Sequence, residues 1–319
     1  MRYDAAHQGW HGASAARPQT ADGRLTVSPN PSESAPVIAW SYNLPASPRG
    51  FCLAREKRWL LVWDDRNALC LLDGAGRLQA QRLFSGKLTA ACCSDDGTAL
   101  AVVGSRGEVW WLAPDLTSVW ERKLPAPAQA AALESFGQYL AVADASGGLR
   151  YFDRHGRPVT QIDSPRPFQY LAFVPAGIYV AASADFGLVA YIDLQGRWAW
   201  REGLVMHVGG LAVAGIDGGV ILACYTEGLQ RYALSGERRT PFSTVEPWQR
   251  VAVSFDGRVL VAAGLSKRLH VLEGDGRLRC TYTLDAPPTA LTVAALGDQA
   301  FAALPDARIL ALDIRPAGR

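Results

Sequence analysis

The side chains that most often serve in metal binding and nucleophilic catalysis are few and scattered in this sequence. His7 and His11 have the H-x-x-x-H spacing that would place both imidazoles on one face of a helix. The segment around them shows little helical pattern and no third ligand accompanies them, so we expect no metal site there. His155, His207 and His270 lie far apart, and the sequence implies no Ser or Cys partner for any of them. We therefore predict no catalytic, cofactor-binding or metal-binding residues.

The cysteines indicate a reduced protein. No pair among the six has C-x-x-C spacing, and most lie within apolar, strand-like runs: Cys52, Cys70, Cys92, Cys93, Cys224 and Cys280. Buried thiols in such runs behave as small hydrophobic side chains, which fits a reducing compartment. The N-terminal segment lacks the apolar run of a signal peptide, and no stretch approaches the length of a membrane span. We expect a cytoplasmic protein with no membrane insertion.

The charge balance argues against nucleic acid as a partner. The chain has 32 basic and 30 acidic residues, for a formal net charge of +2. Nucleic-acid-binding proteins usually carry a basic excess or a basic stripe, and neither is evident here. We expect protein partners instead.

A period of 40 residues organises most of the chain. The turn motif D-x-x-G-R and its variants place Gly76, Gly156, Gly196, Gly236 and Gly276 at multiples of 40 residues from one another. A second column with the same spacing is apolar throughout: Leu69, Val109, Leu149, Val189, Leu229, Leu269 and Ile309. A fixed period in this range predicts stacked repeats, so residues 36–319 are expected to form one domain. The glycine of the motif is expected to serve backbone geometry.

Each 40-residue row contains four short β-forming runs separated by turn residues. In the sixth row these runs are "WQRVAVS", "VLVAAGL", "RLHVLE" and "LRCTYTL". Four antiparallel strands per row correspond to one blade of a β-propeller. The first run keeps a small residue at one position in every row: Cys52, Cys92, Ala132, Ala172, Ala212, Ala252 and Thr292. Because strands crowd together near a propeller axis, this column favours a closed ring.

The two ends of the chain are expected to share the last blade. Seven rows supply the first three strands of a blade, but only six supply a fourth. The segment 37–44 matches the fourth-strand pattern, with Trp40 in the column of Trp120 and Trp200. The sequence therefore predicts an all-β fold: a seven-bladed β-propeller of four-stranded blades, closed by an N-terminal strand in the last blade. We expect this strand to be buried through Ile38, Trp40, Tyr42 and Leu44.

Two segments carry a family resemblance. "GLVAYIDLQGRWAW" from Gly187 has a Gly, an aliphatic pair, Asp, Gly and Trp, and "SFDGRVLVAAG" from Ser254 has the s-x-D-G-x-x-L pattern. These segments resemble the bacterial quinoprotein-like (PQQ-type) and WD40-like propeller repeats, respectively. The Gly-His dipeptide of standard WD40 repeats is missing, and the one Trp-Asp pair, Trp63–Asp64, falls in a predicted second strand. The resemblance implies a rigid platform for protein partners.

A partner is expected to bind the face around the channel mouth. In this fold the loops between blades and the loops joining second to third strands lie on that face, where six candidates gather: Arg49, Arg166, Phe168, Tyr170, Trp248 and Arg250. Trp, Tyr and Arg dominate binding hot spots, so we predict a non-enzymatic protein–protein interaction scaffold or a subunit of a larger assembly. Alternatively, Phe168 and Trp248 cap the blade ends, because their column is mostly apolar. A mixed-charge surround is expected from Asp64, Asp65, Arg66, Arg106, Asp185 and Glu227.

The alternative function is a propeller enzyme or a small-ligand-binding propeller that uses the central channel. The predicted channel-mouth column is polar and contains no carboxylate or His: Arg49, Thr89, Gln129, Gln169, Gly209, Gln249 and Thr289. A hard-metal site needs several oxygen ligands, usually carboxylates, and the column could equally be solvated with no ligand. Residues 1–35 show no alternation, so we expect a disordered tail. The alternative is a partner-docking segment anchored by Tyr3 and Trp10.

Overall fold

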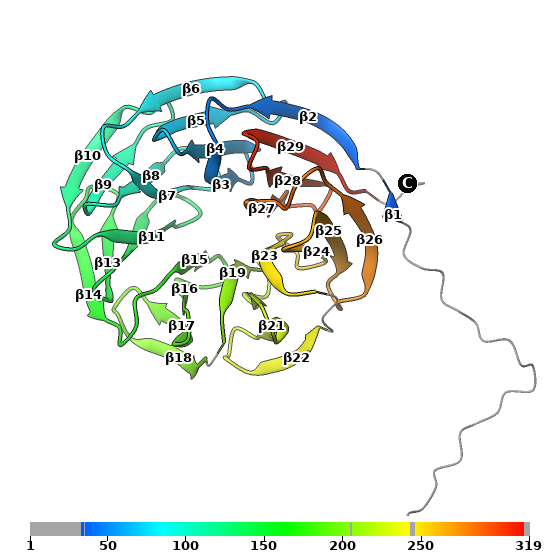
Figure 1. The fold of residues 1–319 in the computed structure, drawn as a ribbon. Helices are drawn as coiled ribbons and strands as arrows, with labels where there is room; N and C mark the ends of the chain where they lie inside the picture. The colour runs from blue at the N-terminus through cyan, green and yellow to red at the C-terminus, as the bar shows by residue number, and fades with distance from the viewer. Residues whose placement is uncertain (1–32, 35, 205, 243–245, 316–319) are drawn as a thin grey trace, which may run out of the picture. The chain divides into compact units, whose positions relative to one another are not determined.

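The computed structural model describes residues 33–34, 36–204, 206–242 and 246–315. All of them lie in one compact unit, Pro31–Arg319. It consists of seven sheets arranged in a ring, each with four antiparallel strands, and one sheet gains a short fifth strand (Figure 1). The predicted seven-bladed β-propeller is therefore confirmed. Most of the predicted tail, residues 1–35, falls outside the described residues and stays a prediction.

The strands of each blade follow the chain from the channel outward. Blade one contains β3 (Pro48–Ala54), β4 (Trp59–Asp64), β5 (Ala68–Leu72) and β6 (Leu78–Leu83). Blade two contains β7 (Leu88–Cys93), β8 (Leu100–Gly104), β9 (Glu108–Leu112) and β10 (Ser118–Lys123). Blade three contains β11 (Ala128–Leu133), β12 (Tyr139–Asp144), β13 (Gly148–Asp153) and β14 (Pro158–Asp163). Blade four contains β15 (Tyr170–Val174), β16 (Tyr179–Ala184), β17 (Leu188–Asp193) and β18 (Trp198–Gly203).

The remaining three blades repeat this order. Blade five contains β19 (Val208–Val213), β20 (Val220–Cys224), β21 (Gly228–Tyr232) and β22 (Arg238–Phe242). Blade six contains β23 (Trp248–Val253), β24 (Val259–Gly264), β25 (Arg268–Glu273) and β26 (Leu278–Thr283), and β1 (Glu33–Ser34) adds to its outer edge in parallel. Blade seven contains β27 (Ala290–Val293), β28 (Gln299–Ala303), β29 (Arg308–Asp313) and β2 (Val37–Asn43).

The ring is held together by apolar packing between neighbouring blades. The second and third strands of the blades are buried almost throughout, as in β5, where all five residues are buried. The innermost strands contact one another in an unbroken cycle, and β27 of blade seven contacts β3 of blade one. The small-residue column predicted from the sequence lies on these innermost strands and lines the channel.

Ring closure follows the predicted pairing of the two chain ends. β2 lies beside β29 and pairs with it antiparallel (Figure 1). Tyr42 is opposite Ile309, and the Leu44 amide donates to the Ala307 carbonyl at 2.8 Å. Leu44 is buried, whereas Trp40 and Tyr42 are half-buried. The expectation for Ile38 was wrong, because its side chain is 50% exposed. The register shifts between Ile38 and Trp40, so a bulge interrupts the alternation that would have turned Ile38 inward.

The D-x-x-G-R motif forms the turn between third and fourth strands, as predicted. In blade three, Oδ1 of Asp153 accepts hydrogen bonds from the amides of His155 and Arg157, both at 2.9 Å. Its Oδ2 pairs with Arg157 Nε at 2.7 Å. Gly156 adopts a φ of 74°, a left-handed conformation that glycine reaches without strain. The motif is thus a self-contained turn, which explains its repetition.

Candidate functional site

The predicted rim residues separate into buried and accessible groups. Phe168 is 0% exposed and Trp248 is 1% exposed, so both pack inside their blades as caps. Phe168 lies against Trp198 with a centroid distance of 6.3 Å, and Trp248 meets His270 edge-on at 5.1 Å. Neither ring can contact a partner unless the loops above it move. A docking surface must therefore be built from the other four candidates and their neighbours.

Arg49 lies in blade one, and an acidic neighbour engages its side chain. Its Nε is 2.5 Å from Oδ1 of Asp65, and both side chains are almost half exposed. Asp64, expected in the charged surround, is instead only 1% exposed. Its Oδ1 accepts hydrogen bonds from the amides of Arg66 and Ala68, both at 2.9 Å, so it holds the tight turn after β4.

An aromatic cluster that the sequence did not single out lies on this face at blades four and five. His207, in the connection between these blades, contacts Phe186 edge-on with a centroid distance of 4.1 Å. Tyr225, in the loop after β20, lies 5.9 Å from the same imidazole. Phe186 is 48% exposed, and the side chain of His207 is 59% exposed. The cluster thus presents aromatic surface to solvent.

Asp185 fixes the geometry of this cluster. Its Oδ2 lies 2.8 Å from His207 Nδ1, and its Oδ1 accepts a hydrogen bond from the Val208 amide at 2.9 Å. The Asp185 amide in turn donates to Gln169 Oε1 at 2.7 Å. The Phe186 amide donates to the Met206 carbonyl at 3.2 Å. Two loops from adjacent blades are therefore locked together beneath the exposed rings.

Three of the predicted rim residues border this cluster. A Cβ on Gly187, next to Phe186, would lie 2.9 Å from the Arg166 side chain, so Arg166 packs along the same loop. Burial raises the pKa of Tyr170, and the nearby charge of Arg250 acts in the opposite direction. We call this group the rim patch, and it comprises Arg166, Tyr170, Phe186, His207, Tyr225 and Arg250.

Arg250 spans the channel mouth. Its Nε donates to the Thr289 carbonyl at 2.8 Å, and its Nη1 donates to the carbonyls of Gly209 and Gln249 at 3.0 and 2.9 Å. The guanidinium therefore ties blades five, six and seven together at their inner edge. Within the part of the chain that the structure describes, neither Arg250 nor Arg166 has a carboxylate partner.

The predicted channel-mouth column coincides with a repeated β-bulge. In five blades the pairing of first and second strands skips one residue: Arg49, Thr89, Gln129, Gly209 and Gln249. A bulged residue is unpaired and its side chain is re-aimed. Backbone geometry thus accounts for the polarity of this column, because its members lie outside the ladder at the mouth.

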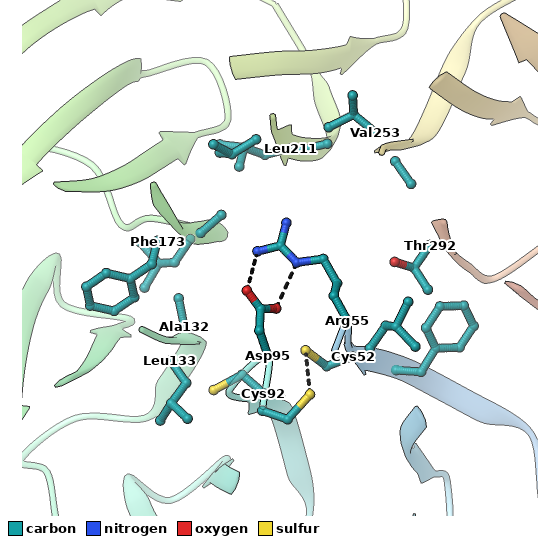
Figure 2. A pocket seen from close by; sticks show the side chains of 18 of the residues that line it. Cys52, Arg55, Cys92, Asp95, Ala132, Leu133, Phe173, Leu211, Val253 and Thr292 are labelled. Atoms are coloured by element: carbon teal, nitrogen blue, oxygen red, sulfur yellow. Dashed lines mark hydrogen bonds and ion pairs between the residues drawn. The ribbon is translucent and has the colours of Figure 1, made fainter. Parts of the chain in front are cut away.

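The channel below the mouth is a cavity of about 320 Å³ lined by all seven innermost strands (Figure 2). Its walls are mostly apolar, but an ion pair that the sequence did not reveal lies at the end opposite the rim patch. Arg55 donates from Nε and Nη2 to the two carboxylate oxygens of Asp95, both at 2.7 Å (Figure 2). The guanidinium also lies 5.0 Å from the ring centroid of Phe255. The channel therefore does contain a carboxylate, although one already engaged by arginine.

Two features of the described residues bear on other functions. No three His, Cys, Asp or Glu side chains among them are arranged to hold a metal ion. None of these residues belongs to a helix with the length and apolarity that crossing a lipid bilayer requires.

Comparison with known proteins supports the architecture. No family model and no curated protein sequence matches the chain. The β-propeller domain of Cps50 (Swd1) from Myceliophteria thermophila is similar in structure, with a TM-score of 0.76 and 14% identity over 87% of this chain and 99% of that one. This likeness shows the fold, a β-propeller. The finer resemblance to bacterial WD40-like and quinoprotein-like repeats has no matching family model and stays a prediction.

Proposed function

We propose that this chain is a non-enzymatic protein-interaction scaffold, or a subunit of a larger assembly, that docks a protein partner on the rim patch. The observation that carries the proposal is the exposed cluster of Phe186, His207 and Tyr225, held in place by Asp185. Exposed aromatic side chains on a pre-organised scaffold give large contact area at low entropic cost. A surface of this kind favours a protein partner.

The charges on the rim patch define the chemistry of that partner. Arg166 and Arg250 have no carboxylate partner among the described residues, whereas Asp185 is already satisfied by His207 and a backbone amide. The partner segment would place an apolar side chain on the aromatic cluster and a carboxylate near the two arginines. Charge-assisted pairs of this type set orientation and specificity.

The experiment compares two exposed phenylalanines on opposite faces. A partner is captured from native extract, identified and purified, and its dissociation constant is measured for the wild type, Phe186→Ala and Phe136→Ala. Phe136 is 62% exposed in the turn between β11 and β12, at the opposite end of the strands. We expect Phe186→Ala to weaken binding by about thirtyfold or more, as for a hot-spot aromatic residue. Phe136→Ala should bind like the wild type, and the reverse result would place the interface on the other face.

The central channel is the second candidate site. Its cavity of about 320 Å³ reaches the size of small-molecule pockets, and the Arg55–Asp95 pair gives it one polar feature. A ligand in the channel would raise the melting temperature of the wild type and not that of Arg55→Ala.

We propose a reducing setting such as the cytoplasm, since all six cysteines are free thiols.

A further inference from the structure

Two cysteines from neighbouring blades meet at the channel wall. Cys52 lies on β3 of blade one and Cys93 lies on β7 of blade two. Their sulfur atoms are 3.3 Å apart, and Figure 2 draws this contact as a dashed line from the sulfur of Cys52. A disulfide has an S–S distance of about 2.05 Å, so the two sulfurs need to approach by only about 1 Å.

Both thiols are positioned where a small oxidant can reach them. Cys52 and Cys93 line the channel cavity, as does Cys92. Successive residues of a strand point to opposite faces, so Cys92 and Cys93 are turned to different sides, and it is the Cys93 sulfur that contacts Cys52. Cys70 and Cys224 are buried elsewhere in the blades and do not line the cavity.

The surroundings favour Cys52 as the attacking sulfur. A hydrogen bond from the Cys93 thiol is the largest influence on Cys52 and lowers its pKa. Burial and the charge of Asp95 raise the pKa of Cys52, whereas the charge of Arg55 lowers it further. The same contact raises the pKa of Cys93 well above its usual value, and burial raises that of Cys92. The thiolate is the reactive form of cysteine, so oxidation should begin at Cys52.

From this geometry we infer that Cys52 and Cys93 form a reversible disulfide when a peroxide enters the channel. The Cys52 thiolate attacks one oxygen of hydrogen peroxide, the O–O bond breaks, and hydroxide leaves and is protonated to water. Cys52 is then a sulfenic acid. Cys93 loses its proton and attacks the Cys52 sulfur, the S–O bond breaks, and a second water forms. Two thiols are thus oxidised by two electrons in total, and one peroxide is reduced to two waters.

The Cys52–Cys93 disulfide would change how blades one and two are held together. Apart from the chain connection between β6 and β7, blades one and two meet through packing and hydrogen bonds, and no disulfide joins neighbouring blades among the described residues. The disulfide would fix β3 to β7 at the channel wall, next to the Arg55–Asp95 pair. A dithiol reductant would reverse it by thiol–disulfide exchange.

The test is peptide mapping of the full-length protein after brief treatment with hydrogen peroxide. We expect the loss of two hydrogens per chain, one linked peptide pair joining Cys52 to Cys93, and recovery of both thiols with dithiothreitol. Cys52→Ser should abolish the link, whereas Cys92→Ser should retain it. Thermal unfolding of each variant first establishes that it folds.

A second experiment distinguishes the attacking sulfur from the resolving sulfur. In Cys93→Ala the sulfenic acid on Cys52 has no resolving thiol, so a dione probe that traps sulfenic acids should label Cys52 far more than in the wild type. The inference is overturned if the linked peptides join Cys92 to either neighbour. It is equally overturned if Cys52 goes to sulfinic acid with no disulfide, or if neither thiol reacts while a free cysteine peptide in the same tube is oxidised.

Discussion

The indole Nε1 of Trp200 donates a hydrogen bond to the Leu234 carbonyl of the next blade, at 2.9 Å. The ring lies over the turn that contains Gly236, where an added Cβ would come within 2.6 Å of it. Two other tryptophans on outer strands also donate an indole hydrogen bond to a carbonyl 34 residues further along the chain. Trp40 donates to the Gly74 carbonyl and Trp120 to the Arg154 carbonyl. The outer strand of one blade thus clamps the outermost turn of the next, a contact made by the outer strands of blades two, four and seven.

This clamp gives the first prediction. Trp200 packs between Tyr191 and Tyr232, with centroid distances of 4.8 and 5.7 Å. Trp200→Phe keeps a ring between the tyrosines and loses the hydrogen bond, so it should cost about 1 kcal/mol. Trp200→Ala also loses the packing and should cost about 3 kcal/mol. Urea unfolding measures both, and equal losses would show that stacking contributes nothing.

Ring closure gives the second prediction. Among the described residues, deleting 1–34 removes only the two-residue strand β1, so we expect the melting temperature to change little. Deleting 1–44 also removes β2, which covers β29 through Trp40, Tyr42 and Leu44. Each large apolar side chain that loses its burial costs about 1.5–3 kcal/mol, which for three is comparable to a typical total stability of about 5–15 kcal/mol. Equal melting temperatures for the two truncations would contradict this account of closure.

The architecture could be predicted from the sequence because the 40-residue period acts on every strand at once. At a given column, each of the seven rows needs the same kind of residue, either an apolar side chain for the core or a turn residue. The strands, the turns and the missing fourth strand could therefore all be located. Ile38 was misplaced because its orientation depends on a β-bulge between the third and fourth strands of the blade. The bulge recurs at the equivalent position in other blades, as between Ser118 and Trp120, but no column of Gly or Asp marks it as the turns are marked.

The rim patch and the thiol pair could not be found by this route. Phe186, His207 and Tyr225 occupy different columns and meet only because two loops are locked by Asp185, with Phe186 at a φ of 45°. Cys52 and Cys93 occupy adjacent columns of the 40-residue rows. Adjacent residues of a strand point their side chains to opposite faces, so the sequence did not suggest that these two would meet. They meet because the two residues come from different blades that pack face to face, Cys93 being part of the core between blades one and two.

Arg250 gives the third prediction. Its guanidinium satisfies three carbonyls at the channel mouth, so Arg250→Met should destabilise the protein by about 1–3 kcal/mol. Arg250→Lys keeps the charge without the planar fork and should be intermediate. Arg166→Met is the matched control, because that guanidinium has no partner among the described residues, and it should change stability by less than about 0.5 kcal/mol. If Arg166→Met is the more damaging in chemical unfolding, Arg250 is not a structural tie.

The last prediction concerns acid. Burial would raise the pKa of Asp193, but hydrogen bonds from the amide and side chain of Arg197 outweigh it, and the pKa is lowered. The same holds for Asp153 with Arg157. Because the folded pKa lies below the unfolded value of about 3.9, this stabilisation is complete above that value and is lost as the pH falls through the folded pKa.

The stability gap between the wild type and Asp193→Asn should therefore be constant above about pH 5 and shrink below about pH 4. Urea midpoints across this range measure the gap, with Glu121→Gln, an exposed carboxylate outside these turns, as control. A gap for Asp193→Asn that persists unchanged down to about pH 2, well below the unfolded pKa, would mean that the turn is held by its backbone geometry and not by the ionised carboxylate.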